Sequence, residues 1–523
     1  MLKSIKITNF KPFGEGKPVR LAPITLIYGP NSSGKSSVIQ SLLLLRQTLT
    51  GQQTGSRNDL ITRGEMVDLG NFLSVLHRHD RDRKLGLEFE FDPASSRPRG
   101  VRNEPDPCAG ISLSFSARSP TSIEVIPTLE LIDFKVEDAA RGSFGFQLER
   151  CISADRSSAD VDEDVDDNDD PAPSQAVPSE EREGDFKFGG NSNLAALYSL
   201  VLRLGAQRHG QGGPSAELSD KEEWPNPDAA VDALKSARFS RGPGGTLGRE
   251  FLPCWTRPIG QVWNPRMVLR TFDIRLRRTV GALTYLGPLR AHPERLYALK
   301  GIPGRSVGPH GEHAVQILYH DHASEISSPS LLERLNTYCE ELNIPYGFEL
   351  QSVGNEITGD LVVLSLLDTR TGISVAPTDV GFGIGQLLPI LVEGMVASGL
   401  QSQRIVCVEQ PEIHLHPRLQ ASMADFFRST ACLRGGSESG QRQEGGVQWI
   451  LETHSEALIS RLQRRIRERA LSSTDVCVLY VEPNGEKGSV IKELRLDEDG
   501  EFIDLWPDGF FVEGLADMFG DEK

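Results

Sequence analysis

The chain has 523 residues, more than one hydrophobic core usually holds, so about two or three packed units are expected. Its seven cysteines show no CxxC or Cys/His spacing, which argues against a zinc site and indicates a reduced compartment. No run reaches the roughly twenty apolar residues of a membrane span, and the N-terminus lacks the apolar core of a signal peptide. We therefore expect a cytoplasmic protein without a membrane partner.

The net charge of -17 is concentrated in one segment, because residues 155–185 hold thirteen acidic residues and two arginines. Such a segment cannot bury enough apolar surface to order itself, so we predict a disordered acidic insertion over 151–190. The alternative is an acidic mimic that occupies a basic groove. Two basic stretches, 266–278 and 461–469, are expected to be solvated helix faces. Because arginines also suit phosphates, DNA stays a candidate partner.

The N-terminal half begins with strands around a glycine-rich loop. Alternation over 2–8 and the apolar run 24–28 predict two strands, and residues 37–47 predict a mostly buried helix. Alternating runs over 87–91, 111–115 and 129–136 predict an antiparallel sheet beside this core. Helices are expected near 193–204 and before Thr284. From Leu361 strands and helices alternate again, which predicts a nucleotide-binding fold split into two parts.

Residues 29–36 match the phosphate-loop pattern GxxxxGK[ST] at every fixed position. The glycines let backbone N–H groups curl around phosphates, and the following helix directs its positive end at them. We expect Lys35 to contact the β- and γ-phosphates of ATP and Ser36 to ligate Mg²⁺. The predicted nucleotide-binding residues of this loop are Gly29, Pro30, Asn31, Ser32, Ser33, Gly34, Lys35, Ser36 and Ser37.

A second glycine-rich turn, residues 378–386, precedes an apolar helix with Pro389 in its first turn. Alone it is weak evidence, but it stands shortly before the acidic motif described next. The N–H groups of a helix N-terminus suit an anion. The predicted nucleotide-binding residues of this turn are Asp379, Gly381, Gly383, Gly385 and Gln386.

The apolar run 405–408 fits a buried parallel strand, and Glu409 and Glu412 at its end can face a metal held by the phosphate loop. Ser36 and Glu409 are thus the predicted metal ligands. A further apolar run ends at Thr453 and His454.

These motifs together resemble the ABC and SMC-type ATPases of prokaryotes, including RecF and overcoming-lysogenization-defect proteins. Those proteins follow the acidic strand with an Asp-Glu-Pro-Glu-like stretch and then Leu-His-Pro, and here 409–412 reads Glu-Gln-Pro-Glu before Leu-His-Pro at 415–417. In the ABC and SMC-type ATPases that this motif resembles, a water-activating Glu stands where this chain has Gln410. Glutamine cannot accept a proton from water, so the resemblance makes Glu412 the candidate base or implies slow hydrolysis. The resemblance implies an α/β P-loop NTPase of ABC/SMC type, with an antiparallel β subdomain and an inserted mixed region.

The resemblance also assigns roles to single residues. It makes the turn 378–386 the signature that closes over the γ-phosphate held by a second subunit. It makes His454 the switch histidine that hydrogen-bonds that phosphate, and it gives His414 and His416 a structural role rather than that of a metal pair. Residues 285–295 and 506–511 also resemble recurrent features of such ATPases, but no chemistry follows for them.

The predicted organisation has five parts. They are the N-terminal part of the ATPase core with the β subdomain (1–150), the acidic insertion (151–190), a mixed inserted region (191–283), the C-terminal part of the core (284–480) and a tail (481–523).

Two functions follow as expectations. The first is an ATPase that binds and hydrolyses MgATP as a homodimer or higher oligomer, coupled to a DNA transaction or antiviral defence through a separately encoded effector such as a nuclease. The second is a slow, ATP-gated scaffold that sequesters and releases an effector. A transport ATPase is disfavoured by the long insertions. The residues after His454 are too few for a Toprim nuclease, and 497–499 predict a solvated turn.

Overall fold

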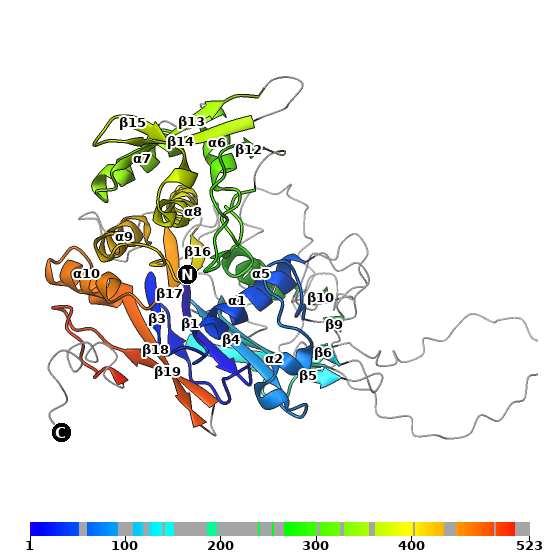
Figure 1. The fold of residues 1–523 in the computed structure, drawn as a ribbon. Helices are drawn as coiled ribbons and strands as arrows, with labels where there is room; N and C mark the ends of the chain where they lie inside the picture. Colours follow the sequence, from blue (N-terminus) through cyan, green and yellow to red (C-terminus); the bar gives the residue numbers. More distant parts are fainter. Residues whose placement is uncertain are drawn as a thin grey trace, which may run out of the picture.

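The computed structural model describes residues 1–51, 60–92, 108–118, 125–138, 142–150, 186–194, 197, 239–240, 254–255, 266–299, 301, 304–324, 329–354, 361–400, 403–432, 446–485 and 488–507. Within these residues the strands form three sheets (Figure 1). Most of the acidic insertion and most of the predicted helix near 193–204 lie outside the described residues.

The central sheet of the described chain has six strands in the order β11-β16-β17-β3-β18-β19. The first five are parallel and β19 is antiparallel at the edge. Their bounds are β11 Thr284–Leu286, β16 Arg404–Glu409, β17 Val447–Glu452, β3 Ile24–Tyr28, β18 Val476–Asn484 and β19 Gly488–Leu494. β3 and β17 are buried throughout, as expected for parallel strands covered on both faces. The β18 strand crosses the predicted boundary between 480 and 481.

Side chains of these strands alternate between two hydrophobic cores. Ile27 and Cys407 point into one core, whereas Leu26 and Val408 point into the other. This alternation follows from the two-residue repeat of a strand. The sheet therefore separates two apolar layers, and its carboxyl edge is where the loops after β3, β16 and β17 meet.

The first core lies against a second sheet, which is antiparallel and has nine described strands in the order β10-β9-β8-β7-β6-β5-β4-β1-β2. Helices α1 (Lys35–Thr50) and α5 (Arg266–Thr279) contribute to the same core. The predicted strands near 2–8, 87–91, 111–115 and 129–136 and the helix before Thr284 are confirmed. The strand bounds are β1 Leu2–Thr8, β2 Val19–Arg20, β4 Leu85–Phe91, β5 Cys108–Arg118, β6 Ile126–Asp138, β7 Gly142–Arg150, β8 Phe186–Phe188, β9 Phe239–Ser240 and β10 Cys254–Trp255.

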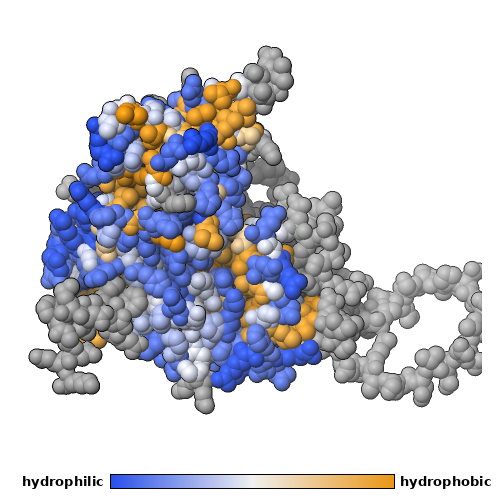
Figure 2. All heavy atoms as spheres, in the orientation of Figure 1, coloured by the Kyte–Doolittle hydropathy of each residue, from blue (hydrophilic) through white to orange (hydrophobic). Residues whose placement is uncertain are grey.

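The second core lies under helices and a small sheet (Figure 1). The helices are α6 Ala314–Ser324, α7 Leu331–Glu341, α8 Phe382–Ser398, α9 Pro417–Thr430 and α10 Glu456–Arg467, and the small sheet holds β12 Tyr297–Ala298, β13 Tyr346–Ser352, β14 Leu361–Asp368 and β15 Ile373–Val375. Short helical turns occur at α2 Phe72–Val75, η1 His77–His79, η3 Pro377–Asp379 and η4 Ser473–Asp475. In the view of Figure 2, α10 presents a mainly hydrophilic surface, and apolar residues gather around the small sheet. None of the helices among the described residues is both long and apolar enough to cross a membrane.

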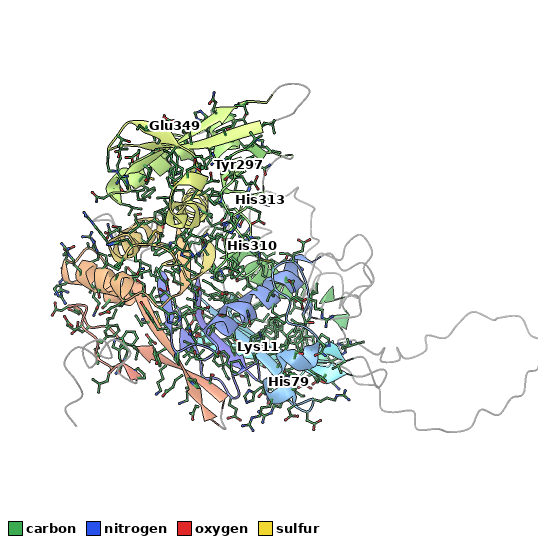
Figure 3. All side chains as sticks on the ribbon, in the orientation of Figure 1. Lys11, His79, Tyr297, His310, His313 and Glu349 are labelled. Carbon is green, nitrogen blue, oxygen red and sulfur yellow. The ribbon has the colours of Figure 1, made fainter. Side chains whose placement is uncertain are left out.

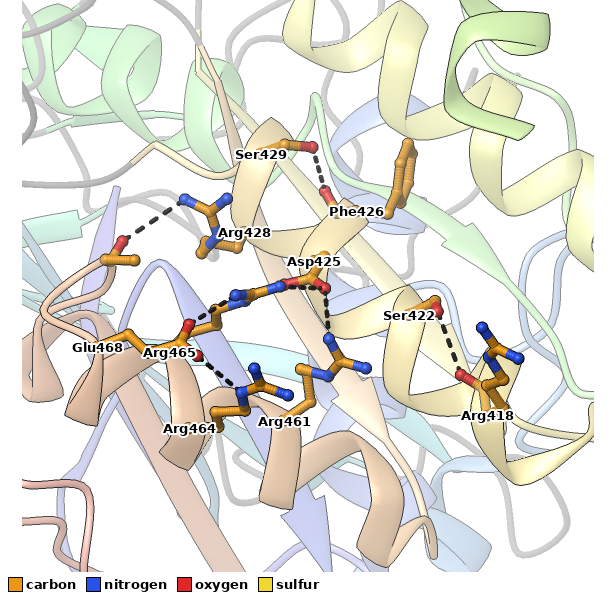
Figure 4. A network of polar contacts seen from close by, with 11 residues as sticks. Arg418, Ser422, Asp425, Phe426, Arg428, Ser429, Arg461, Arg464, Arg465 and Glu468 are labelled. Carbon is orange, nitrogen blue, oxygen red and sulfur yellow. Dashed lines mark hydrogen bonds and ion pairs between the residues drawn. The ribbon is translucent and has the colours of Figure 1, made fainter. Parts of the chain in front are cut away.

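Several arginines of the two basic stretches are paired within the described part of the chain. On α10, Arg465 donates to Asp425 at 2.5 Å and to Glu468 at 2.6 Å, and Arg461 donates to Asp425 at 3.2 Å (Figure 4). Arg464, Arg467 and Arg469 form ion pairs with Glu468, Glu501 and Asp499.

On α5 the expectation of a solvated face is wrong for Arg275. This side chain is only 3% exposed and donates to the carbonyl oxygen of Asp92 at 2.7 Å. Its neighbour Arg277 donates to Asp273 at 2.9 Å. The cause is packing, because Leu269, Phe272 and Leu276 bury one side of α5 against the nine-stranded sheet and carry the adjoining polar residues inward.

Candidate functional site

The loop between β3 and α1 has the backbone shape that phosphate binding requires. Gly29 and Gly34 have φ of 143° and 106°, a region that favours glycine, and Ser32 has φ of 62°. A Cβ on Gly34 would lie 2.5 Å from Cγ of Pro12. The Ser33 hydroxyl is buried and has no hydrogen-bond partner among the described residues. A glycine-rich loop that holds an orphaned buried hydroxyl and leads into a helix N-terminus fits a phosphate-binding loop.

Lys35 is folded over this loop. Its ammonium group donates to the carbonyl oxygens of Gly29 at 3.0 Å and Pro30 at 2.9 Å, and the residue is 5% exposed. Burial lowers the pKa of Lys35, while Glu452 and Glu412 counteract the shift. The lysine is therefore held at the loop by neutral acceptors, with two carboxylates nearby that favour its charged form.

Glu452 is a site residue that the sequence analysis missed. It ends β17, the strand between β16 and β3, and is 5% exposed. Burial raises the pKa of its carboxyl, whereas the nearby Ser36 hydroxyl and Lys35 lower it, and its Oε2 is buried without a hydrogen-bond partner among the described residues. A carboxylate at the end of a buried strand was a usable signal, but only the strand order shows that it faces the phosphate loop.

Glu409 ends β16 beside Glu452, with which it is in register. The Tyr285 hydroxyl donates to its Oε1 at 3.0 Å. Burial and the charge of Glu452 raise the pKa of Glu409 to about 7, whereas the Tyr285 hydrogen bond and Arg290 lower it. Burial and Glu409 raise the pKa of Tyr285, so the phenol stays protonated and donates. Removing solvent from two neighbouring carboxylates in this way favours a cation between them.

Glu412 is held by the segment that carries the predicted switch histidine. The Thr453 hydroxyl donates to Glu412 Oε2 at 2.7 Å, and the His454 backbone N–H donates to Oε1 at 2.7 Å. Both carboxylate oxygens are thus fixed. The His454 ring is half-buried, and burial followed by the nearby Lys35 charge lowers its pKa, which favours the neutral ring.

The predicted nucleotide-binding turn lies beside the loop after β16. A Cβ on Gly383 would lie 2.8 Å from the His414 carbonyl oxygen, and one on Gly385 would lie 2.5 Å from Cγ of Pro293. These two glycines therefore allow close packing within the chain. Gly381, at the N-terminus of α8, is exposed with open space at its Cβ position. Asp379 forms an ion pair with Arg295, and Gln386 is buried.

The two histidines of the acidic motif, His414 and His416, make contacts with parts of the chain other than the site carboxylates. His416 is the residue before α9, and its ring accepts from the backbone N–H of Arg418 at 3.2 Å. The carbonyl oxygen of His414 faces Gly383. Among the described residues, no group of three His, Cys, Asp or Glu side chains could hold a metal ion.

The donor set nevertheless suits Mg²⁺ bound with a nucleotide. Mg²⁺ prefers oxygen ligands and usually takes one or two carboxylates together with substrate phosphates. Ser36, Glu409 and Glu452 offer a hydroxyl and two carboxylates at one edge of the central sheet. The orphaned Ser33 hydroxyl and the glycine-lined loop suit the phosphates, so the residues present fit MgATP.

Comparisons with known proteins agree with this geometry. The model of the AAA ATPase domain family matches residues 1–119 and 316–459, about half of the chain. These ranges contain the phosphate loop, the 378–386 segment that runs into the first turn of α8, the acidic strand end and His454. No curated protein matches the chain significantly.

Three solved structures of SMC heads overlap with the chain at low TM-scores. The SMC head domain from Thermotoga maritima has 10% identity and a TM-score of 0.35, covering 95% of this chain and 99% of that one. The Smc head domain with an extended coiled coil, bound to the C-terminal domain of ScpA, from Pyrococcus furiosus has 8% identity and a TM-score of 0.36, with coverage of 94% and 96%. An SmcHead bound to the C-winged helix domain of ScpA has 10% identity and a TM-score of 0.36, with coverage of 95% and 98%.

The predicted α/β class is confirmed, with the phosphate loop after a central parallel strand and an antiparallel sheet beside it. The family match covers the sequence on both sides of the inserted regions, as a split nucleotide-binding fold requires. The chain belongs to the AAA ATPase domain family of P-loop proteins.

Proposed function

We propose that this protein binds MgATP at the 29–36 loop and hydrolyses it, in a site that a second copy completes. The observation that carries the proposal is the convergence of Lys35, Ser36, Glu452 and Glu412 at one sheet edge. A buried lysine near carboxylates, in a glycine-rich loop at a helix N-terminus, suits a nucleotide whose phosphates bring a metal ion. A cytoplasmic location suits such a nucleotide supply.

In this proposal each side chain has a separate task. Lys35 and the loop N–H groups bind the phosphates, and Ser36, Glu409 and Glu452 hold the magnesium side of the nucleotide. Mg²⁺, when bound, neutralises charge that develops on the phosphate oxygens. Glu412 accepts the proton of the attacking water, and the Thr453 hydroxyl and His454 N–H orient its carboxylate. The His454 ring supplies a hydrogen bond to the γ-phosphate.

The direct test compares Lys35→Ala with Glu412→Gln. Lys35→Ala removes the cation at the phosphates, so ATP binding and phosphate release should both fall at least about a hundredfold. Glu412→Gln keeps the volume and removes the proton acceptor, so phosphate release should fall while ATP binding stays within about threefold of the parent. Turnover by Lys35→Ala at the parent rate would contradict the proposal.

The biological coupling that we propose is to a DNA transaction or antiviral defence, through a separately encoded effector such as a nuclease. DNA contact through α10 is weakly supported, because Arg464, Arg465 and Arg467 already pair with acids of the same chain. A gel-shift assay at low salt, with and without ATP, tests the DNA branch. Binding that weakens steeply with added salt would favour it, and no binding would contradict it.

The second candidate function is an ATP-gated scaffold that turns over slowly and holds an effector. Two observations favour slow turnover. Both carboxylate oxygens of Glu412 already accept hydrogen bonds, and Gln410 stands in place of an acid. A carboxylate oxygen that already accepts a hydrogen bond has fewer lone pairs left for an attacking water. Turnover slower than the ATP-driven opening and closing of the dimer would support this function.

A further inference from the structure

Residues 284–295 have no part in the proposed chemistry, yet the first three of them pair with the strand that carries Glu409. The segment begins with β11, which pairs in parallel with β16 so that Leu286 lies opposite Val408. From this strand the Tyr285 hydroxyl reaches the Glu409 carboxylate at 3.0 Å. The phenol contacts Oε1 and leaves Oε2 for another ligand.

Arg290 contacts the backbone of the same strand end. Its Nη2 donates to the Glu409 carbonyl oxygen at 2.7 Å, and its Nη1 donates to the Gln410 carbonyl oxygen at 3.1 Å. The side chain is 4% exposed, so water does not compete for these bonds. Gln410 has φ of 47°, which non-glycine residues adopt only where surrounding contacts hold them. Arg290 thus donates to the carbonyl groups before and after the Cα of Gln410, and these two bonds hold the backbone conformation of Gln410.

The rest of the segment is tied to its neighbours. The Leu289 carbonyl oxygen is bonded to the ring of His310, which Figure 3 labels, at 3.0 Å. The Gly287 N–H donates to the Pro309 carbonyl oxygen at 2.8 Å. Further along, Pro293 packs against Gly385. The segment is therefore fixed independently of Glu409 and can orient it.

We propose that Tyr285 and Arg290 are positioning residues of the MgATP site, with Tyr285 aiming the Glu409 carboxylate at the metal and Arg290 holding the turn that presents it. This inference rests on the proposed role of Glu409 as a metal ligand. A ligand held by a hydrogen bond loses less freedom when it coordinates, and such outer partners commonly contribute a tenfold or larger factor to metal affinity.

The experiment measures ATP affinity by calorimetry, once with Mg²⁺ and once with EDTA, on the full-length chain. The ratio of the two affinities reports the metal contribution without any turnover. Tyr285→Phe removes one hydroxyl from the carboxylate. The matched control is Tyr297→Phe, in β12 of the same region (Figure 3), where the hydroxyl accepts from the backbone N–H of Glu294 at 2.9 Å.

We expect Tyr285→Phe to lower the ratio about tenfold and to leave the affinity in EDTA unchanged. Tyr297→Phe should match the parent in both. A general structural defect would instead weaken binding in EDTA as well. An unchanged ratio in Tyr285→Phe, with a clear Mg²⁺ effect in the parent, overturns the inference alone. A parent with no Mg²⁺ effect overturns the metal assignment and the inference with it.

Arg290 is tested by comparing Arg290→Lys with Arg290→Met. Lysine can still donate to one of the two carbonyl oxygens, whereas methionine leaves both unpaired in a buried position. The ratio should fall in both variants and further in Arg290→Met. Equal ratios in the two variants and the parent would overturn the role of Arg290. Because the methionine variant risks misfolding, the lysine variant decides the question if Arg290→Met is not folded.

Discussion

Glu409 lies at the buried end of β16, 8% exposed, with Glu452, Tyr285 and Arg290 around it. Burial and the charge of Glu452 raise the proton affinity of Glu409, and the phenol and guanidinium reduce this effect. The balance leaves the pKa of Glu409 at about 7. Glu409 thus retains a proton near neutral pH, which a bound cation would displace.

The raised pKa of Glu409 predicts a pH effect on stability in the absence of nucleotide and Mg²⁺. A carboxyl with a raised folded-state pKa stabilises the fold fully below its unfolded pKa, about 4.3, and this contribution is lost as pH rises through about 7. Glu409→Gln keeps an acceptor for Tyr285 and removes the titration.

Chemical denaturation at several pH values checks this. Between about pH 4.5 and 8, the free energy of unfolding of the parent should fall by up to about 3 kcal/mol relative to Glu409→Gln. Parallel pH profiles for the two proteins would mean that Glu409 titrates normally.

The sequence predicted those parts of the site whose residues act through contacts close by in the chain. It missed residues that reach the site from distant strands. Residues 29–36 act through their own backbone, so their pattern sufficed for the loop and the helix after it. Glu452 acts only because β17 lies between β16 and β3, and strand order is a tertiary property. Tyr285 reaches Glu409 from a strand 124 residues away, and no local signal marks that contact.

At the scale of elements, the N-terminal turn of α8 packs closely against other parts of the chain. The packing leaves no room for a Cβ at Gly383 or Gly385. The segment 378–386 was predicted from its glycines to contact a phosphate. Close packing is an additional reason why Gly383 and Gly385 are glycines. Both residues let the helix N-terminus lie against His414 and Pro293. Gly381 is exposed, so in the proposed dimer it can contact the nucleotide of a second copy.

This packing predicts opposite behaviour for two neighbouring glycines. Gly383→Ala should lower the free energy of unfolding by about 1–3 kcal/mol, because its Cβ would lie 2.8 Å from a backbone oxygen. This strain exceeds the roughly 0.5–1 kcal/mol that alanine gains over glycine in a helix. Gly381→Ala, with open space at its Cβ, should change stability by less than about 1 kcal/mol. Thermal or urea unfolding of both variants decides, and equal losses would contradict the packing argument.

At the scale of the whole molecule, the chain has two elements that we propose bind the phosphates, the 29–36 loop and the N-terminus of α8. In the proposed mechanism one subunit supplies the first and its partner supplies the second. Closure is then a two-fold arrangement with two composite sites. A variant that binds ATP without turnover, Glu412→Gln, should accumulate as the dimer in sedimentation with saturating MgATP.

The composite site is tested most directly by mixing two inactive chains, Lys35→Ala and Gly381→Glu. The glutamate adds a negative side chain in open space, where it repels the partner's γ-phosphate without disturbing its own fold. Each variant alone should release little phosphate. In a mixed dimer one site combines both defects and the other pairs an intact Lys35 with an intact turn, so activity should return to at most about half of the parent rate. If folded, dimer-competent chains show no recovery on mixing, or if Gly381→Glu alone is fully active, the composite-site account is wrong.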